Sequence, residues 1–167
     1  LQAETDLAPF SQWAKAGTPP GGQLWMQINH PGRQVYEAMG ETALSPSDVA
    51  LDMGNLSKLF AQPRAMTEAE IETLIERFAT TSQKAESAGF TGVQVHAAHG
   101  YLISQFLSPL SNRRTDQWGG DITNRSRILI EVIKRIRAVV APKFCVSVKL
   151  NSADFQTGGF SLADAIT

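Results

Sequence analysis

The side chains best able to do chemistry lie close together in the sequence, in the segment His96–Tyr101. His96, His99 and Tyr101 follow a short run of alternating apolar residues, 91–96, that predicts a strand. Imidazole and phenol groups at the end of a strand can bind an oxygen atom of a ligand and transfer protons. Two histidines and a tyrosine in one loop favour a functional site, and the alternative is that both histidines are core residues with satisfied hydrogen bonds.

A His-x-x-His pair can also form half of a zinc site. No Cys, Asp or Glu lies near His96 and His99 at the short spacing that would complete a ligand set. Small residues also stand where the helical His-Glu-x-x-His pattern has its glutamate. We therefore predict no metal at this site.

Two further polar side chains interrupt apolar strands. Gln27 lies in the predicted strand 23–29, and Lys149 lies in the predicted strand 144–150. A buried amide needs partners, so Gln27 either pairs with backbone or binds a ligand that has both donors and acceptors. A lysine pointing into the protein needs an anion or a carboxylate, whereas a lysine on the outer face of the strand needs neither. The residues alone leave both alternatives open for each side chain.

Strands and helices alternate along the chain, and their order positions these side chains. Apolar spacing predicts helices over 6–15, 67–89 and 124–140, and the second begins with the capping box Thr67-x-x-Glu70. An irregular stretch over 30–65 is long enough to indicate a functional loop. The connections allow neighbouring strands to be parallel, which gives α/β architecture with ligands at the C-terminal ends of the strands. The polar residues gather at those ends: His30, His96, His99, Lys149 and Asn151.

Composition excludes several classes of protein. The 167 residues carry 15 Lys and Arg against 16 Asp and Glu, a net charge of −1, so nucleic acid is not an expected partner. No apolar run approaches the roughly 18 residues of a membrane span. The one cysteine, Cys145, is predicted to lie in the core and fits a reducing compartment. The sequence holds no Rossmann, P-loop or Gly-x-Ser-x-Gly motif.

The two ends of the chain predict a piece of a longer protein. The first residue is Leu1 rather than methionine, and a helix that opens with the cap Ser161-x-x-Asp164 stops after about one turn. We find no internal boundary, and expect 1–167 to be a single segment truncated at both ends.

Several blocks of this sequence, in the same order, resemble the Old Yellow Enzyme family of FMN-dependent oxidoreductases. The blocks are Met26–Gln34, Gly92–Pro109, Asn112–Gly120, Asn124–Arg125 and Val148–Asn151. The resemblance implies a (β/α)8 TIM barrel with FMN at its C-terminal mouth, in which 23–29, 91–96 and 144–150 are the third, fourth and fifth strands. A complete barrel needs about 250 residues, so the chain would be its central part.

The resemblance also implies a role for each candidate residue. Gln27 matches the glutamine that binds the flavin pyrimidine edge, and Lys149 matches the basic residue near flavin N1 and O2, where many members have arginine. His96 and His99 match the pair that binds an electron-withdrawing oxygen of the substrate, and some members have asparagine in the second place. Tyr101 matches the proton donor to the carbon alpha to the carbonyl.

The activity implied by the resemblance is that of an ene reductase. Such an enzyme uses NADH or NADPH to reduce FMN, which then passes hydride to the activated C=C bond of an enal, an enone or a similar acceptor. We expect a cytoplasmic protein with a small-molecule substrate, no membrane or nucleic-acid partner, and a homo-oligomer as a further option for the full-length protein. The alternatives are a truncated fragment that binds no flavin, and a dienoyl-CoA reductase-like branch, which lacks the His-x-x-His pair. The charged loop with Arg113, Arg114, Asp116, Trp118, Gly119 and Gly120 is expected to be structural.

Overall fold

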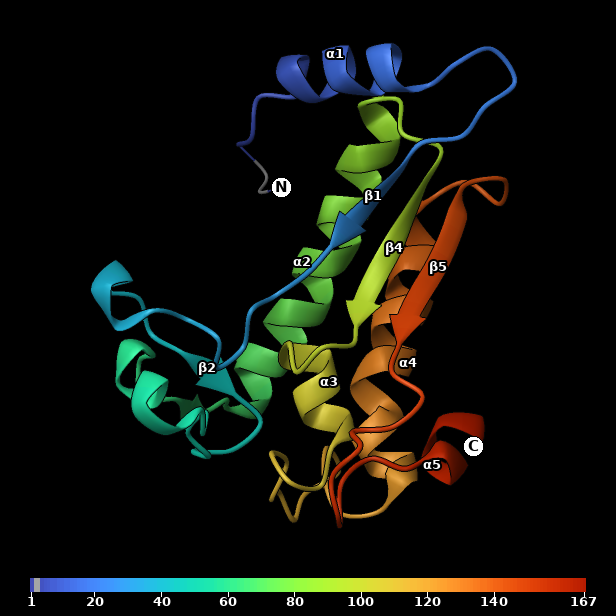
Figure 1. Ribbon diagram of the computed structural model, residues 1–167. Helices are drawn as coiled ribbons and strands as arrows, with labels where there is room; N and C mark the ends of the chain where they lie inside the picture. Colours follow the sequence, from blue (N-terminus) through green and yellow to red (C-terminus); the bar gives the residue numbers. More distant parts are fainter. Residues whose placement is uncertain (2–3) are drawn as a thin grey trace. The chain divides into compact units, whose positions relative to one another are not determined.

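Three neighbouring strands form the sheet that carries the candidate residues. In the computed structural model, which describes residues 1 and 4–167, they are β1 (Trp25–Ile28), β4 (Gly92–Ala97) and β5 (Cys145–Leu150), in the order β1-β4-β5. β1 and β4 pair in parallel with Gln27 opposite Gln94, and the three arrows point the same way in Figure 1. The prediction of three parallel neighbouring strands is confirmed.

The described residues divide into two units. The first comprises Leu1–Ile28, Ala69–Val95 and Ile130–Lys149, and the second comprises Asn29–Glu68, His96–Leu129 and Leu150–Thr167. Each unit draws on three separate stretches of the chain, so its packing depends on contacts between residues far apart in sequence.

Helices α1 (Ala8–Gly17), α2 (Glu68–Ser87) and α4 (Ile122–Val139) correspond to the helices predicted over 6–15, 67–89 and 124–140, with bounds shifted by up to two residues. α2 buries one face, and every residue of β4 except the half-buried Gln94 is buried. The fully buried side chains of this core include Ile71, Ile75, Val93, Val95, Val132 and Ile136. The spacing of Ile71 and Ile75, and of Val132 and Ile136, is the period that predicted helices over 67–89 and 124–140, because burial of one apolar stripe stabilises a helix.

Gly89 ends α2, as predicted, in a conformation that needs glycine. Its φ is 98°, and the N–H of Phe90 donates to the carbonyl of Ala85 at 3.1 Å. A left-handed residue after the last turn allows such a bond to satisfy a carbonyl that the helix leaves unpaired.

The second unit holds short elements that the sequence patterns did not predict. They are η1 (Glu37–Met39), β2 (Leu44–Ser45), η2 (Gly54–Leu59), β3 (Arg64–Ala65) and α3 (Leu102–Leu107). β2 pairs with β3 in parallel, and α3 lies against β2. The stretch expected to be irregular over 30–65 therefore contains secondary structure. The helix expected after Ser161 is confirmed as α5 (Leu162–Ile166), with a complete Ser161 and Asp164 capping box.

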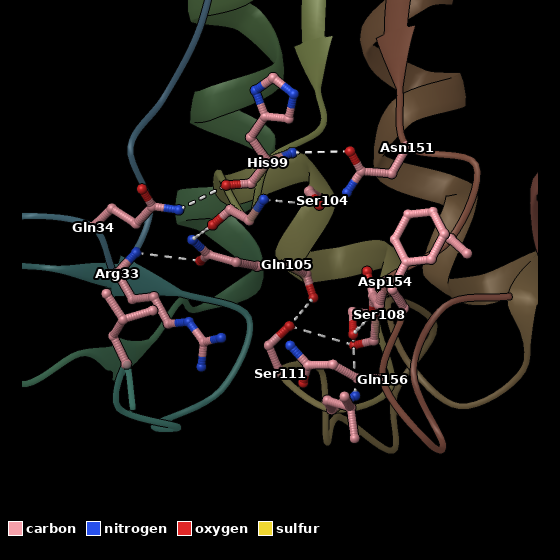
Figure 2. A pocket seen from close by; sticks show the side chains of 15 residues that line it. Arg33, Gln34, His99, Ser104, Gln105, Ser108, Ser111, Asn151, Asp154 and Gln156 are labelled. Atoms are coloured by element: carbon pink, nitrogen blue, oxygen red, sulfur yellow. Dashed lines mark hydrogen bonds between the residues drawn. The ribbon is translucent and has the colours of Figure 1, made fainter. Parts of the chain in front are cut away.

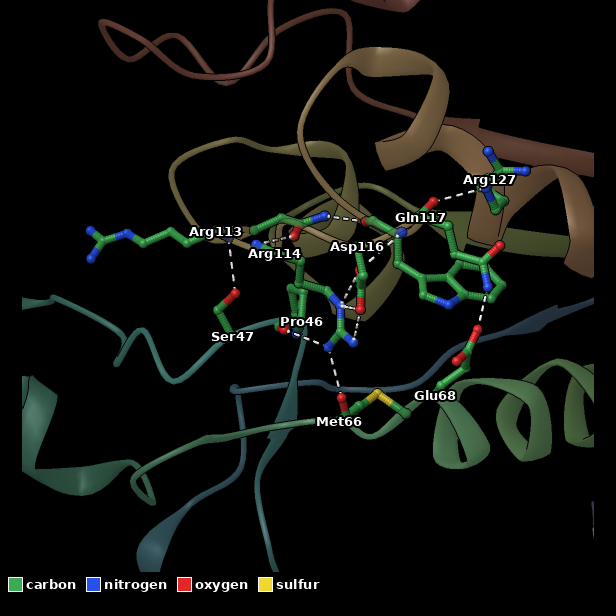
Figure 3. Close-up of polar contacts among 11 residues, drawn as sticks. Pro46, Ser47, Met66, Glu68, Arg113, Arg114, Asp116, Gln117 and Arg127 are labelled. Atoms are coloured by element: carbon green, nitrogen blue, oxygen red, sulfur yellow. Dashed lines mark hydrogen bonds and ion pairs between the residues drawn. The ribbon is translucent and has the colours of Figure 1, made fainter.

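The loop before α4, which was predicted to be structural, is held by contacts of Arg114 and Asp116 (Figure 3). Arg114 forms a bidentate ion pair with Asp116, and its Nη1 donates to the carbonyls of Pro46 at 3.1 Å and Met66 at 2.7 Å. Trp118 is buried. The hydrogen bonds from Arg114 hold the pKa of the Asp116 carboxyl below its ordinary value.

Cys145 does not lie in the core, and this prediction is wrong. The residue is half-buried, as is nearly all of β5, because β5 is an outer strand of the three-stranded sheet. Apolar neighbours in the sequence do not distinguish an outer strand from a central one.

Within the part of the chain that the structure describes, no helix is both long and apolar enough to cross a membrane.

Candidate active site

A row of amides crosses the sheet in the first unit. Nε2 of Gln27 donates to Oε1 of Gln94 at 2.7 Å, and Nε2 of Gln94 donates to Oγ of Ser147 at 3.4 Å. The expectation that Gln27 is buried is wrong: along β1, Met26 and Ile28 are buried, and Gln27 is exposed. Its partner is another side chain rather than backbone, and its position leaves it accessible to a ligand.

Lys149 lies on the same face of β5 as Ser147, because side chains alternate along a strand. It is half-buried. Among the described residues its ammonium group makes no hydrogen bond or ion pair. The row with Gln27 and Gln94 therefore offers donors, acceptors and an unneutralised positive charge, which suits the edge of a planar polar ligand that gains negative charge.

The second unit brings His96, His99 and Tyr101 together, as the sequence predicted. The ring of His96 lies edge to face with both others, with ring centroids 5.1 Å from His99 and 4.9 Å from Tyr101. His96 is buried, Tyr101 is half-buried and His99 is exposed. Nδ1 of His96 accepts the N–H of Ala98 at 3.2 Å, which assigns the ring proton to Nε2 in the neutral imidazole.

His99 occupies a backbone conformation that is unusual for a residue with a side chain. Its φ is 59°, and Gly100 follows with a φ of 69°. Nε2 of Gln34 donates to the carbonyl of His99 at 2.9 Å, and Oδ1 of Asn151 accepts the N–H of His99 at 3.2 Å (Figure 2). Both peptide groups next to His99 are therefore satisfied by side chains from distant segments.

Gln105, in α3, links this turn to the rest of the second unit. The side chain is 1% exposed. Its Oε1 accepts from the N–H of Arg33 at 3.2 Å and from the hydroxyl of Ser45 at 3.3 Å. Its Nε2 donates to the carbonyls of Pro31 at 3.3 Å and Gly100 at 2.7 Å. All four hydrogen-bonding positions of the amide are used, as a buried amide requires.

A cavity of about 560 Å³ opens beside the turn, within the second unit. Arg33, Gln34, His99, Gln105, Asn151 and Asp154 are among the residues that line it (Figure 2). Burial lowers the pKa of the Arg33 guanidinium, and the charge of Asp154 opposes that shift. The cavity is large enough for a small molecule, and His99 is one of its lining residues.

Four residues of these arrangements were not predicted as site residues: Gln34, Gln94, Gln105 and Asn151. Asn151 directly follows one predicted strand, and Gln94 alternates with His96 along another predicted strand. Their partners lie far away in the sequence, so no local spacing indicates them. Among residues 1 and 4–167, no group of three or more His, Cys, Asp or Glu side chains is arranged to hold a metal ion.

The chain matches the model of one protein family over residues 3–167, and that family is described as NADH:flavin oxidoreductase / NADH oxidase. One relative is the NADH-dependent flavin oxidoreductase of Aspergillus parasiticus, which is 45% identical over 150 residues. The match covers 90% of this chain and 34% of the relative, so the chain spans about a third of that protein.

Two solved structures resemble the chain over nearly its whole length. A complex of 2-naphthoyl-CoA reductase with 2-naphthoyl-CoA matches with a TM-score of 0.91 and 32% identity, covering 99% of this chain and 26% of that one. An Old Yellow Enzyme homologue from Zymomonas mobilis matches with a TM-score of 0.83 and 29% identity, covering 98% and 47%.

Proposed function

Because the chain belongs to the NADH:flavin oxidoreductase / NADH oxidase family, we propose that the whole protein is an ene reductase of the Old Yellow Enzyme type. The 167-residue chain is part of a (β/α)8 barrel. We propose that it is the central part of that barrel. The cofactors of the family are FMN and NADH or NADPH. The proposed reaction is reduction of the activated C=C bond of an enal or enone. The observation that carries it is the contact of His96 with both His99 and Tyr101.

The amide row fits one edge of the flavin. The pyrimidine edge of FMN presents carbonyl oxygens and an N–H, and the amides of Gln27 and Gln94 offer both complementary groups. The ammonium of Lys149 would stand near N1 and O2, where a positive charge favours reduction. Bound FMN supplies hydride to the substrate after NADH or NADPH has reduced it. Lys149 in place of arginine retains the charge and loses the fork of donors.

His96 and His99 would bind the substrate carbonyl oxygen. The imidazole of His99 is exposed and can donate to that oxygen, and the ring of His96 lies beside this imidazole. Donors held at that atom stabilise the negative charge that develops as hydride reaches the beta carbon. Tyr101 would deliver a proton to the alpha carbon. Its hydroxyl makes no hydrogen bond among the described residues, so none of those residues competes for the proton.

The variant Tyr101→Phe tests this assignment in the FMN-loaded full-length protein. Reduction of cyclohex-2-enone should slow by about a hundred- to ten-thousandfold, the usual contribution of a general acid. Reduction of a quinone, which needs no proton on carbon, should continue at nearly the normal rate, as stopped-flow absorbance would show. Tyr36→Phe is the matched control, since Tyr36 is the other tyrosine and is 54% exposed. Small and equal effects of Tyr101→Phe on both acceptors would remove Tyr101 from the chemistry.

An acyl-CoA ester is the second candidate acceptor. The match to 2-naphthoyl-CoA reductase, over 99% of this chain, favours it. Comparing turnover of an enoyl-CoA with that of the corresponding free enone separates the two candidates.

Flavin absorbance of the purified 167-residue chain tests the remaining alternative, a fragment that binds no FMN. The single cysteine fits a cytoplasmic enzyme, and gel filtration of the full-length protein would show whether it forms homo-oligomers.

A further inference from the structure

Side chains hold the turn that carries His99. Two consecutive residues, His99 and Gly100, have left-handed backbone conformations. For a residue with a Cβ this conformation costs free energy and persists where the surroundings fix it. Gly100 is fixed within its own segment, because its N–H donates to Oγ of Ser104 at 3.3 Å and its carbonyl accepts from Gln105 at 2.7 Å. The peptide groups of His99 depend on more distant residues.

Gln34 and Asn151 hold the two peptide groups on either side of the His99 Cα (Figure 2). Oδ1 of Asn151 accepts the N–H at 3.2 Å, and Nε2 of Gln34 donates to the carbonyl at 2.9 Å. Both side chains are half-buried. Fixing the N–H and the carbonyl fixes φ and ψ, and these angles determine the direction in which the imidazole leaves the backbone.

We propose that Gln34 and Asn151 are positioning residues, which hold the His99 backbone so that its imidazole meets the substrate oxygen. This inference rests on the proposed role of His99 in binding that oxygen. Gln34 lies in the segment after β1, and Asn151 follows β5 directly.

Gln34 and Asn151 make hydrogen bonds of opposite direction to His99, so paired substitutions can test the inference. Gln34 must donate, so Gln34→Glu replaces the donor with a carboxylate facing a carbonyl. Asn151 must accept, so Asn151→Asp keeps the required oxygen, whereas Asn151→Leu removes it. A role in packing alone would make the two carboxylate variants behave alike.

Ligand affinity measures the effect in the FMN-loaded full-length protein. The probe is cyclohex-2-enone, and its Kd is read from the flavin absorbance of the oxidised protein, in which no turnover occurs. Gln34→Glu and Asn151→Leu should each raise the Kd about five- to tenfold, as expected for loss of one fixed hydrogen bond. Asn151→Asp should stay within about twofold. The double variant should fall short of the product of the two changes, because both release the same turn.

Histidine-selective NMR gives a readout that does not depend on activity. In the spectrum of the FMN-loaded full-length protein, the ring signal that disappears in His99→Asn belongs to His99. In Gln34→Glu and Asn151→Leu that signal should move toward the position of a flexible histidine. The matched controls Gln83→Glu and Asn55→Leu change exposed residues and should move neither the signal nor the Kd.

The outcomes separate this inference from the proposed function. Suppose Gln34→Glu and Asn151→Leu leave both the Kd and the His99 signal unchanged, while His99→Ala raises the Kd about tenfold or more. The positioning role is then overturned and the proposed function stands. Suppose instead that the signal moves in both variants, but neither they nor His99→Ala alter the Kd. The hydrogen bonds then hold the turn, and the proposed role of His99 is wrong.

Discussion

Replacing the buried amide of Gln105 should destabilise the second unit strongly. Gln105→Leu keeps the approximate size of the side chain and removes four hydrogen bonds. The bond to the Gly100 carbonyl is short, at 2.7 Å, and the other three lie between 3.2 and 3.3 Å. Taking about 1.5 kcal/mol for the short bond and about 0.5 kcal/mol for each long one gives a loss of about 3 kcal/mol. Native proteins have only about 5–15 kcal/mol of stability, so this loss is large.

Thermal unfolding followed by circular dichroism checks the estimate. For a chain of 167 residues a loss of about 3 kcal/mol lowers the Tm by roughly 6–12 °C. Gln83→Leu is the matched control, since it makes the same substitution at an exposed position of α2. Gly32→Ala should also lower the Tm. Its added Cβ would lie 2.3 Å from Nε2 and Oε1 of Gln105 and would displace the same amide. If Gln105→Leu lowers Tm no more than Gln83→Leu does, the four bonds do not stabilise the fold as argued.

Three further predictions concern the backbone and one ion pair. Gly92→Ala should lower the Tm, because the new Cβ would lie 2.7 Å from Cβ and 2.8 Å from the carbonyl oxygen of Cys145 on the neighbouring strand; an unchanged Tm would show that β4 and β5 can separate at little cost. His99→Asn should leave the Tm nearly unchanged, whereas His99→Val should lower it by several degrees, since valine is poorly tolerated at positive φ; equal Tm values would contradict the left-handed assignment. The pKa of Asp116 is lowered in the folded protein, so its contribution to stability is complete above its unfolded pKa of about 4 and is lost as the pH falls through the lower folded value. Unfolding midpoints measured between about pH 5 and 2 should fall less steeply in Asp116→Asn than in the wild type.

The sequence predicted the elements that bury one apolar face. The helical spacing in α2 survives in the structure, because it reports which side of the helix faces the core. β4 is a strand as predicted, but all of its residues except the half-buried Gln94 are buried, so alternation does not separate two faces there. α3 was missed since all of its residues are buried, polar Ser104 and Gln105 included, and no contrast between two faces remains. Gln27 was expected to be buried because its neighbours are apolar, yet Trp25 on the same face is itself 43% exposed.

Some features of the candidate site depend on residues close together in the sequence, and others depend on contacts between distant segments. The grouping of His96, His99 and Tyr101 is local, so one strand and one turn are sufficient to predict it. The bonds from Gln34 and Asn151 to His99 join segments that only the tertiary structure brings together. Spacing cannot predict such bonds, because any polar side chain after another strand is an equal candidate.

The backbone at His99 restricts which side chains can stand there. At a φ of 59° glycine is favoured, and the other residue types that adopt such angles most readily are asparagine, aspartate and histidine. Glycine has no side chain to bind a ligand, and an ionised aspartate accepts hydrogen bonds but does not donate them. Only histidine and asparagine combine the left-handed backbone with an N–H donor, which accounts for the two residues that the resemblance implies at this place. The geometry of the turn and the proposed binding of a substrate oxygen thus select the same residue types. In that proposal Gln34 and Asn151 support both, because each bonds the peptide on one side of the His99 Cα.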